Sequence, residues 1–445
     1  MLISITKPLF AWEELEDSPS LATVKRVLAA MPDGKLLAAL RDWRGQGRDD
    51  YPMGVLWRVF VVRIVLRHVT TEACLAELRR NAGLRRLIGI DHESQVPNAW
   101  NMSRFEEVLG HEPHVTLMHE AFDEMTRKLG DAVPDLGVDT AGDATHLAAR
   151  AACERVAKEE LADGLTQPAG GRKEYTDDDG KVTKVIEWHG YKLHLLGDVK
   201  HEVALAYHVS GANEGDAENL PIIFAEAKAN LPADRIRTLA YDKAADTNEV
   251  HQLLSREHVR AVIQNRSLWK SEPERMLAGH DGNSNIVFDE AGTVYCYDRV
   301  SQPMVRHRMA YIGYEPDRET IKYRCPAMHE GWECPMAKIC NAGLSYGKTV
   351  RVPREEDLRR FPALPRATKQ FERLYKGRTA IERINARLKI FWGLDDGNIR
   401  GARRFLANVG AVMLVHAAFA TVLATTPRRE GQTLGGMKLS PIAQA

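Results

Sequence analysis

One stretch near the C-terminal end decides how the rest of the chain is interpreted, namely Tyr375-Lys-Gly-Arg378-Thr-Ala-Ile-Glu382-Arg-Ile-Asn-Ala-Arg-Leu-Lys389. It has no proline, its one glycine is in the first turn, and good helix formers dominate it, so it predicts a helix. At about 100° per residue, Tyr375, Arg378, Glu382 and Lys389 stand at roughly 0°, 300°, 340° and 320°, on one face. A single carboxylate beside a phenol and two cations favours a metal ion held next to a nucleic-acid backbone.

The spacing Y-x2-R-x3-E-x6-K in this helix resembles the signature of DDE-type insertion-sequence transposases. The resemblance extends from about residue 50 to residue 425 and is strongest at the signature helix. It implies an α/β fold with a ribonuclease-H-like mixed sheet, in which two aspartates from upstream strands join Glu382. The expected fold class is therefore this catalytic core, preceded by an all-α N-terminal domain. Alternating stretches such as Thr293-Val-Tyr-Cys-Tyr predict an inserted, β-rich subdomain within the core.

The first upstream carboxylate lies in Leu136-Gly-Val-Asp139-Thr-Ala-Gly-Asp143-Ala-Thr145, which reads as a strand. Asp139 and Asp143 are four residues apart, so they point to the same side of that strand. An unpaired buried carboxylate costs several kcal/mol, so this pattern indicates a metal site or a buried ion pair. In the resembled family the first aspartate is followed by a small residue and then Ser or Thr. Asp143-Ala-Thr145 matches this pattern, and we select Asp143 over Asp139.

The second carboxylate is Asp242, at the carboxyl end of the short apolar strand Arg237-Thr-Leu-Ala-Tyr241. Sites in open α/β sheets assemble at this edge. The segment resembles the family's strand-Asp-Lys-Gly-Tyr-Asp turn, with Ala244 and Ala245 replacing the glycine and the aromatic residue. We interpret Asp246 as the N-cap or first-turn acid of a helix that starts near Thr247.

The resemblance implies that Asp143, Asp242 and Glu382 are catalytic residues and metal ligands for two Mg2+ ions, or Mn2+ in their place. Without metal the three carboxylates would repel one another, and hard oxygen ligands suit these cations.

Basic and aromatic side chains near the carboxylates are the expected DNA contacts. They are Tyr375, Arg378 and Lys389 on the signature helix, with Lys192 and His194 on the strand Gly190-Tyr-Lys-Leu-His. The turn that follows, Ala212 to Asp216, resembles the family's entry into its first long helix, with Asp216 as the helix N-cap.

Composition shifts divide the chain into five parts. Residues 1–130 show helical periodicity broken by prolines and resemble the family's DNA-end-binding module, with Arg79, Arg80, Arg85, Arg86 and Arg104 as phosphate contacts. Residues 131–269 form the first part of the core, 270–365 the inserted subdomain, 366–428 the C-terminal part of the core, and 429–445 a flexible tail. Turn residues such as Gln167-Pro-Ala-Gly-Gly and Thr176-Asp-Asp-Asp-Gly predict loops within the first part.

Four of the six cysteines, Cys296, Cys325, Cys334 and Cys340, belong to the insertion. The spacing lacks the close C-x2-C pairs of a strong zinc motif. Two interpretations stay open, a structural Zn2+ site and buried free thiols. The uneven spacing does not resemble a secreted disulfide framework, and it favours a reducing cytoplasm.

Charge and hydropathy restrict the choice of partners. The 61 basic and 61 acidic residues cancel, but from Arg351 to Arg404 there are 15 Lys or Arg against 7 Asp or Glu, which predicts a basic surface around the signature helix. The apolar run Phe405–Ala424 is long enough to span a membrane. Because it contains Asn408 and His416, we expect a buried core helix and no membrane partner.

Together these features predict an enzyme, a DNA transposase that cleaves at the terminal inverted repeats of its element and joins the 3' ends to target DNA by two-metal phosphoryl transfer. We expect double-stranded DNA as the partner, a homodimer or larger assembly in the synaptic complex, and a bacterial, nucleoid-associated location. The alternatives are a ribonuclease-H-like nuclease that no longer transposes and a domesticated DNA-binding protein without catalysis.

Overall fold

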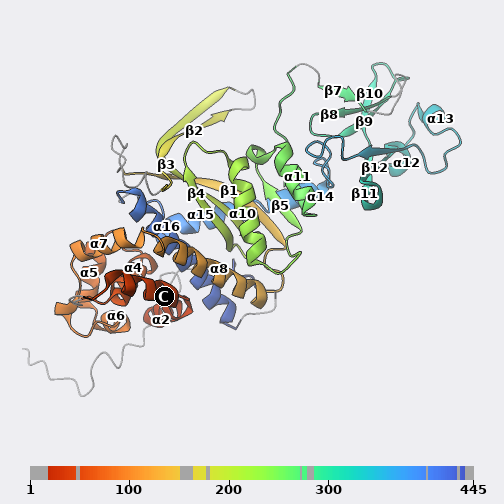
Figure 1. The fold of residues 1–445 in the computed structure, drawn as a ribbon. Coiled ribbons are helices and arrows are strands. Elements are labelled where there is room, and N and C mark those ends of the chain that lie inside the picture. The colour runs from red at the N-terminus through yellow and green to blue at the C-terminus, as the bar shows by residue number, and fades with distance from the viewer. Residues whose placement is uncertain are drawn as a thin grey trace, which may run out of the picture.

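The computed structural model describes residues 19–46, 51–150, 164–176, 181–270, 273–277, 285–396, 399–427 and 431–435. Within these ranges the chain forms a helical region, a central sheet flanked by helices, and an arm that extends from the sheet (Figure 1).

The helical region is built from amphipathic helices that prolines and side-chain caps separate. Thr70, Asn81 and Asn98 each accept a hydrogen bond from a backbone N–H in the first turn of the helix that follows them. The elements are α2 (Pro19–Ala30), α3 (Gly34–Arg44), α4 (Met53–Val65), α5 (Thr71–Arg80), α6 (Ala82–Leu87), the short η1 (Glu93–Gln95), α7 (Ala99–Leu109) and α8 (His114–Ala132).

The central sheet has the strand order β4-β3-β1-β5-β6. β1 pairs antiparallel with β3 and β3 antiparallel with β4, whereas β5 pairs parallel with both β1 and β6. This mixed, ribonuclease-H-like sheet behind a helical N-terminal region confirms the predicted fold class. The strands are β1 (Asp139–Ala148), β3 (Val182–Asp198), β4 (Ala204–Gly211), β5 (Thr238–Tyr241) and β6 (Arg260–Ile263).

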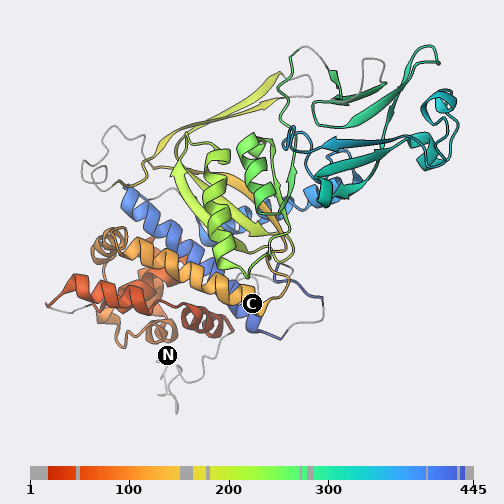
Figure 2. The ribbon, with the colours of Figure 1, turned by 45° about the vertical axis from the view of Figure 1, so that its right-hand side comes forward.

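A β-ribbon projects from this sheet (Figure 2). It forms because β3 continues for 17 residues, and its first half pairs with β2 (Ala169–Thr176). The sequence predicted a loop across Gln167 to Arg172. That prediction was wrong from Ala169 onward, because backbone pairing with β3 outweighs the low strand propensity of the glycines. The predicted turn at Asp177–Asp179 lies outside the described residues.

Helices cover the sheet and connect it to the helical region. α10 (Asp216–Asn230) packs on β4 and β3, α15 (Thr379–Trp392) packs on β3 and β1, and α11 (Asn248–Arg256) and α14 (Lys369–Lys376) pack near β6. The short η2 (Lys243–Ala245) links β5 to α11. α16 (Ala402–Thr425) lies beside α8 (Figure 2). One continuous hydrophobic core therefore includes side chains of α2, the sheet and α16, so a boundary at residue 130 does not separate two cores.

Among the described residues, α16 is the one helix whose length and hydropathy would allow it to cross a membrane, but 89% of its most apolar window is buried inside the protein. Its two interior polar side chains have partners. Arg63 donates to Oδ1 of Asn408 at 2.7 Å, and the backbone N–H of Ala204 donates to Nε2 of His416 at 3.0 Å. These contacts make α16 a packed core helix, as predicted.

The arm is β-rich, as predicted, and has a second, smaller core. One sheet contains β7 (Glu274–Met276), β8 (Ile286–Asp289), β9 (Val294–Asp298) and β10 (Val305–Arg308). The other contains β11 (Ala310–Glu315), β12 (Thr320–Arg324) and β13 (Thr349–Pro353), with the short helices η3 (Pro316–Arg318), α12 (Pro326–Glu330) and α13 (Ala337–Cys340) between strands.

Asp246 joins the end of the arm to the central sheet. Its fully buried carboxylate pairs with Arg359 at 2.8 Å and Arg366 at 2.9 Å, and lies 2.9 Å from Nε2 of His251. The interpretation of Asp246 as a helix cap was wrong, because the side chain of Thr247 caps α11. Local sequence could not reveal this, since both arginines arrive from more than 110 positions away.

Part of the C-terminal segment also packs on the core. Leu434 is fully buried and its backbone N–H donates to Nδ1 of His201 at 3.3 Å, while Arg387 donates to the carbonyl of Gly435. The expected flexible tail is therefore wrong for residues 431–435, because an apolar side chain and backbone groups there find core partners. Residues 428–430 and 436–445 lie outside the described part.

Candidate active site

Parallel pairing of β1 with β5 brings the two predicted aspartates to the same level of the sheet. The pairing aligns Thr140 with Leu239 and Ala141 with Ala240. Continued by two residues, this register sets Asp143 opposite Asp242, which directly follows β5. Asp242 is half-buried and accepts a hydrogen bond from the backbone N–H of Ala244 at 2.8 Å.

A glycine permits the close approach of the chain beside these aspartates. A Cβ added at Gly142 would lie 2.6 Å from Cδ2 of Tyr241, closer than real Cβ atoms approach other atoms. Gly142 precedes Asp143, and Tyr241 precedes Asp242. The ring of Tyr241 is fully buried against the glycine, so the two carboxylates emerge from a closely packed pair of strands.

The signature segment is not one helix, as the sequence predicted, but the two helices α14 and α15, joined at Gly377 and Arg378. There the hydrogen bonds tighten to i→i−3, from Arg378 to the carbonyl of Tyr375 and from Ile381 to the carbonyl of Arg378. Gly377 packs close to Val199, where an added Cβ would lie 2.8 Å from Cγ1. Tight packing at this junction explains the break.

Arg378 connects the carboxylates of different elements. Its guanidinium lies 2.5 Å from Oε1 of Glu382 and 3.9 Å from Oδ1 of Asp143. Burial lowers the pKa of Arg378, but the charges of Asp143, Tyr375, Glu382 and Asp242 outweigh burial and raise it. All three predicted carboxylates therefore act on one cation. Glu382 is half-exposed, whereas Asp143 is largely covered.

Burial raises the pKa of Asp143 to about 6, although Arg378 opposes this change. The nearby carboxylates of Asp242 and Asp216 contribute to this increase in the pKa. Negative charge is thus concentrated at Asp143 beyond what one arginine neutralises, which is the electrostatic condition for binding a cation.

Sequence reasoning gave three polar residues near Asp143 no role at the site. The amide of Asn385 donates to Oδ2 of Asp143 at 3.5 Å, and its buried Oδ1 has no hydrogen-bond partner among the described residues. The buried hydroxyl of Tyr241 also lacks such a partner. Asp216, predicted as an N-cap, is instead the first residue of α10, after Gly215. Only Asn385 had a sequence signal, because it follows Glu382 by three positions on a helix.

Several side chains predicted to contact DNA already have hydrogen-bond partners within the protein. Lys389 donates to the carbonyl of His146 at 2.9 Å, and Lys192 donates to the carbonyl of Glu214 at 2.7 Å and pairs with Asp216 at 3.2 Å. His194 is fully buried against Ser210, so its prediction as a DNA contact was wrong.

Tyr375 and Asp139 occupy different environments. The ring of Tyr375 stacks on Phe371, with the guanidinium of Arg378 at 6.0 Å from the ring centroid. Asp139 begins β1 and accepts a hydrogen bond from the hydroxyl of Thr238 at 2.6 Å. Asp139 therefore has a neutral partner, the hydroxyl of Thr238. Asp143 instead lies near the guanidinium of Arg378, which also pairs with Glu382.

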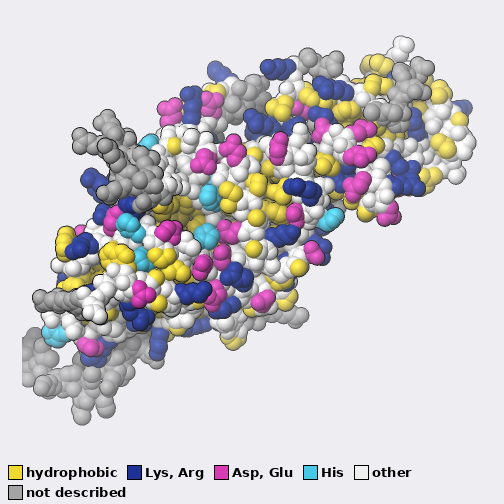
Figure 3. Space-filling view, viewed as in Figure 1, with side chains coloured by type: hydrophobic (Ala, Val, Ile, Leu, Met, Phe, Trp, Pro, Cys, Tyr) yellow, Lys and Arg dark blue, Asp and Glu magenta, His cyan; other side chains and the backbone are white. Residues whose placement is uncertain are grey.

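Many of the arginines between Arg351 and Arg404 pair within the protein. Arg383 and Arg387 both pair with Glu202, and Arg359 and Arg366 are buried against Asp246. In the view of Figure 3, basic and acidic side chains are interspersed over the surface. The expected basic surface around the signature helix is thus reduced, because acidic residues elsewhere in the chain neutralise part of it.

Several of the N-terminal arginines predicted as phosphate contacts also interact with groups of the protein itself. Arg80 pairs with Glu77, Arg85 donates to the carbonyls of Leu78 and Arg79, and Arg104 lies over the ring of Trp100.

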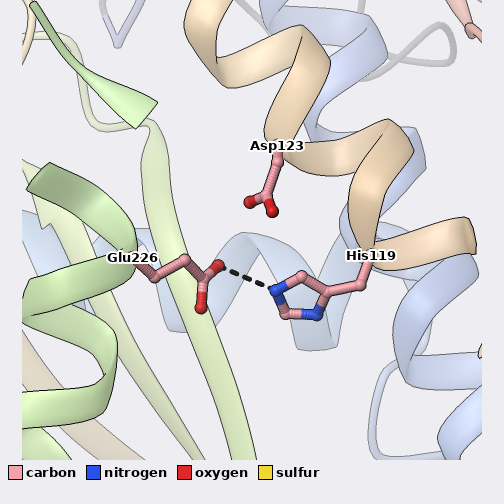
Figure 4. Close-up of side chains that lie close together, drawn as sticks. All are labelled: His119, Asp123 and Glu226. Atoms are coloured by element: carbon pink, nitrogen blue, oxygen red, sulfur yellow. Dashed lines mark hydrogen bonds and ion pairs between the residues drawn. The ribbon is translucent and has the colours of Figure 1, made fainter. Parts of the chain in front are cut away.

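A separate carboxylate cluster joins α8 to α10 (Figure 4). His119, Asp123 and Glu226 are the one described group of three His, Cys, Asp or Glu residues whose ligand atoms all lie within 4.8 Å. Nε2 of His119 is 2.9 Å from Glu226, the imidazole stacks on Tyr207, and Asp123 accepts from Asn230. These contacts satisfy the cluster without a metal. The predicted catalytic carboxylates are spread more widely, with Arg378 between Asp143 and Glu382.

The mixed sheet, with Asp143 in β1, Asp242 directly after β5 and Glu382 on a covering helix, defines the class of ribonuclease-H-like folds. Two family models match the chain, one described as Transposase DDE domain over residues 141–417 and one described as Transposase domain (DUF772) over residues 13–107. No curated protein matches.

Since the first model covers more than half of the chain, the chain belongs to the DDE transposase family. This membership confirms the resemblance found in the sequence. It makes the chain a DNA transposase in a family of polynucleotidyl transferases and nucleases.

Proposed function

We propose that this transposase cleaves DNA at the terminal inverted repeats of its insertion sequence and joins the 3' ends to target DNA, with Asp143, Asp242 and Glu382 as catalytic residues. The observation that carries the proposal is the position of Arg378, on which carboxylates from β1, the end of β5 and α15 all act. Carboxylates from three distant segments would repel one another, so their convergence favours a site for cations.

The residues around Asp143 fit two divalent metal ions. Asp143, Asp242 and Glu382 supply the hard oxygen ligands that Mg2+ and Mn2+ prefer. The partnerless hydroxyl of Tyr241 and Oδ1 of Asn385 offer hydrogen bonds to metal-bound water. When bound, two such ions would activate the attacking hydroxyl and stabilise the leaving oxygen at phosphorus.

The chain's own cations have distinct roles in the proposal. Arg378 pairs with Glu382 and lies near Asp143, and it can turn from Glu382 to a DNA phosphate because arginine offers several donors in a planar fork. Tyr375 lies beside the guanidinium and is only partly buried, so it could contact a phosphate or sugar. Lys389 and Lys192 would exchange their present carbonyl partners for phosphates when DNA binds.

We also propose that the helical region binds the ends of the element as double-stranded DNA. Because two ends must be held together for joining, the active assembly is at least a homodimer.

The test is a cleavage and joining assay on DNA that carries the element's own ends, with Mg2+ and then Mn2+. Glu382→Gln and Asp143→Asn should each reduce both reactions by at least about 100-fold, because each removes a charged ligand at similar volume. Asp139→Asn is the matched control, since its partner is the hydroxyl of Thr238. It should retain activity within a few-fold.

Binding of the same DNA, measured by fluorescence anisotropy, separates catalysis from recognition. Glu382→Gln should bind the element ends with affinity close to that of the wild type. Cleavage without joining by the wild type would identify a nuclease that no longer transposes. Binding without cleavage under either metal would identify a DNA-binding protein and contradict the proposal.

A further inference from the structure

Four cysteines of the arm line one small cavity of about 20 Å3. They come from separate places in the sequence. Cys296 lies in β9, Cys325 directly precedes α12, Cys334 lies in the turn after α12, and Cys340 ends α13. A volume of this size holds roughly one small guest such as a water molecule. The fold of the arm therefore brings together cysteines that the sequence separates by up to 44 positions.

The thiols are close enough to influence one another. Burial, with smaller contributions from Cys325, Cys334 and Cys340, raises the pKa of Cys296 to about 12. Burial also raises the pKa of Cys334, with contributions from Cys325 and Cys340. The four side chains therefore lie near one another, in agreement with the single cavity that they line. A cation bound there would stabilise thiolates.

Polar groups around the cavity point donors at the sulfur atoms. The amide of Asn285 donates to Sγ of Cys340 at 3.7 Å, and the amide of Asn341 donates to Sγ of Cys325 at 3.5 Å. Lys348 also lines the cavity. Amide and ammonium donors beside sulfur are typical of the outer shell around metal-bound thiolates.

The segment that carries three of the four thiols, positions 325–348, adds no side chain to the second hydrophobic core. Its helices α12 and α13 have only five and four residues. Ile339, Leu344 and Tyr346 are exposed. Helices this short are unstable alone, and small modules without a core commonly depend on a metal or disulfides.

We propose that Cys296, Cys325, Cys334 and Cys340 bind one structural Zn2+ ion that fastens the segment 325–348 to β9. Zinc accepts four thiolates in tetrahedral geometry. Binding would release the thiol protons to solvent and leave four Zn–S bonds, with no change in oxidation state. In the structure no three of these Sγ atoms lie within 4.8 Å of one another, so the side chains must turn into the cavity on binding.

The first test is the zinc content of the full-length protein purified without chelator, measured by mass spectrometry of the metal. We expect about one zinc per chain in the wild type and in the control Cys74→Ala, whose thiol is buried in α5, away from the arm. Cys325→Ala and Cys340→Ala should each lose at least half of this zinc. Equal zinc in all four proteins, or none in the wild type after refolding with Zn2+, would overturn the proposal.

A second test needs no substitution and so does not depend on whether the variants fold. Iodoacetamide labelling of the wild type, mapped by mass spectrometry, should be slow at the four cysteines with zinc and at least about tenfold faster after a chelator. Replacement by Co2+ should produce the intense visible absorption of tetrahedral cobalt thiolates. Unchanged labelling with no cobalt band would refute the site. Neither readout uses DNA cleavage, so the result is independent of the proposed function.

Discussion

At the scale of single residues, charged side chains in this protein behave according to their partners. Asp143 and Asp246 are both covered aspartates, but Asp246 is matched by Arg359 and Arg366, whereas Asp143 shares Arg378 with Glu382. Burial by itself raises the pKa of Asp246, but the hydrogen bond from His251 and the charge of Arg366 bring it below the ordinary value. One aspartate is therefore structural and the other is available to a ligand.

Asp246→Asn tests the structural role. The substitution leaves two buried arginines short of negative charge, and breaking a buried pair in this way costs about 3–5 kcal/mol. We expect a clearly lower urea midpoint of unfolding, monitored by circular dichroism. Glu355→Gln is the control, because Glu355 is exposed and lies four positions before Arg359. This substitution should change the midpoint little. Equal midpoints for the two variants would show that the pairs contribute nothing to stability.

At the scale of elements, α16 and α15 set the position of the signature residues. α15 packs on β3 at Gly197, where an added Cβ would lie 2.5 Å from Cδ1 of Ile384. α16 packs on both α15 and β4, and its His416 accepts a hydrogen bond from the backbone of β4. Burial lowers the pKa of His416 to about 3, so the imidazole is neutral inside the folded protein.

This neutral histidine makes stability depend on pH. Below pH 6.5 the unfolded chain binds a proton at His416 and the folded chain does not, so stability falls as pH decreases from 6.5 toward 3. The loss is at most about 1.4 kcal/mol per pH unit, or about 2 kcal/mol at pH 5. His416→Gln keeps an acceptor for Ala204 but cannot ionise.

The measurement compares urea unfolding of the wild type and His416→Gln at pH 7 and pH 5. The variant should lose less stability than the wild type over this interval. His194, whose pKa burial lowers to about 4, contributes the same slope to both proteins and cancels in the comparison. Identical losses would mean that His416 is protonated in the folded state.

At the scale of the whole molecule, the chain has two hydrophobic cores of unequal size. The larger runs through the N-terminal helices, the sheet and α16, and the smaller lies inside the arm. The helical region and the catalytic sheet share buried side chains, so they should unfold together. The arm has its own hydrophobic core and is joined to them by polar contacts such as those of Asp246, so it should open separately.

Hydrogen exchange in Met413→Ala and Ile321→Ala tests this division. Both side chains are fully buried, and each substitution should cost about 2–5 kcal/mol within its own core. Met413→Ala should speed exchange in α4, α8 and β4 but leave β12 and β13 unchanged. Ile321→Ala should do the reverse. Faster exchange in both cores from either substitution would show one cooperative unit.

The sequence by itself determined what depends on neighbours along the chain. Helical and alternating periodicities predicted the N-terminal helices and the β-rich arm, because side-chain direction repeats every 3.6 or 2 residues. The long apolar run predicted the buried α16, and the family resemblance implied the mixed core. The signature spacing and the order of Asp143, Asp242 and Glu382 led to the DDE transposase family, which the family models confirm.

Only the tertiary structure decided which distant groups meet. It paired Asp246 with Arg359 and Arg366. It also paired Glu202 with Arg383 and Arg387, and it placed four cysteines around one cavity. It also divided the signature segment at Gly377, where Val199 packs closely, and buried His194. Periodicity carries no information on such contacts, because they depend on strand order and helix packing between segments that are remote in sequence.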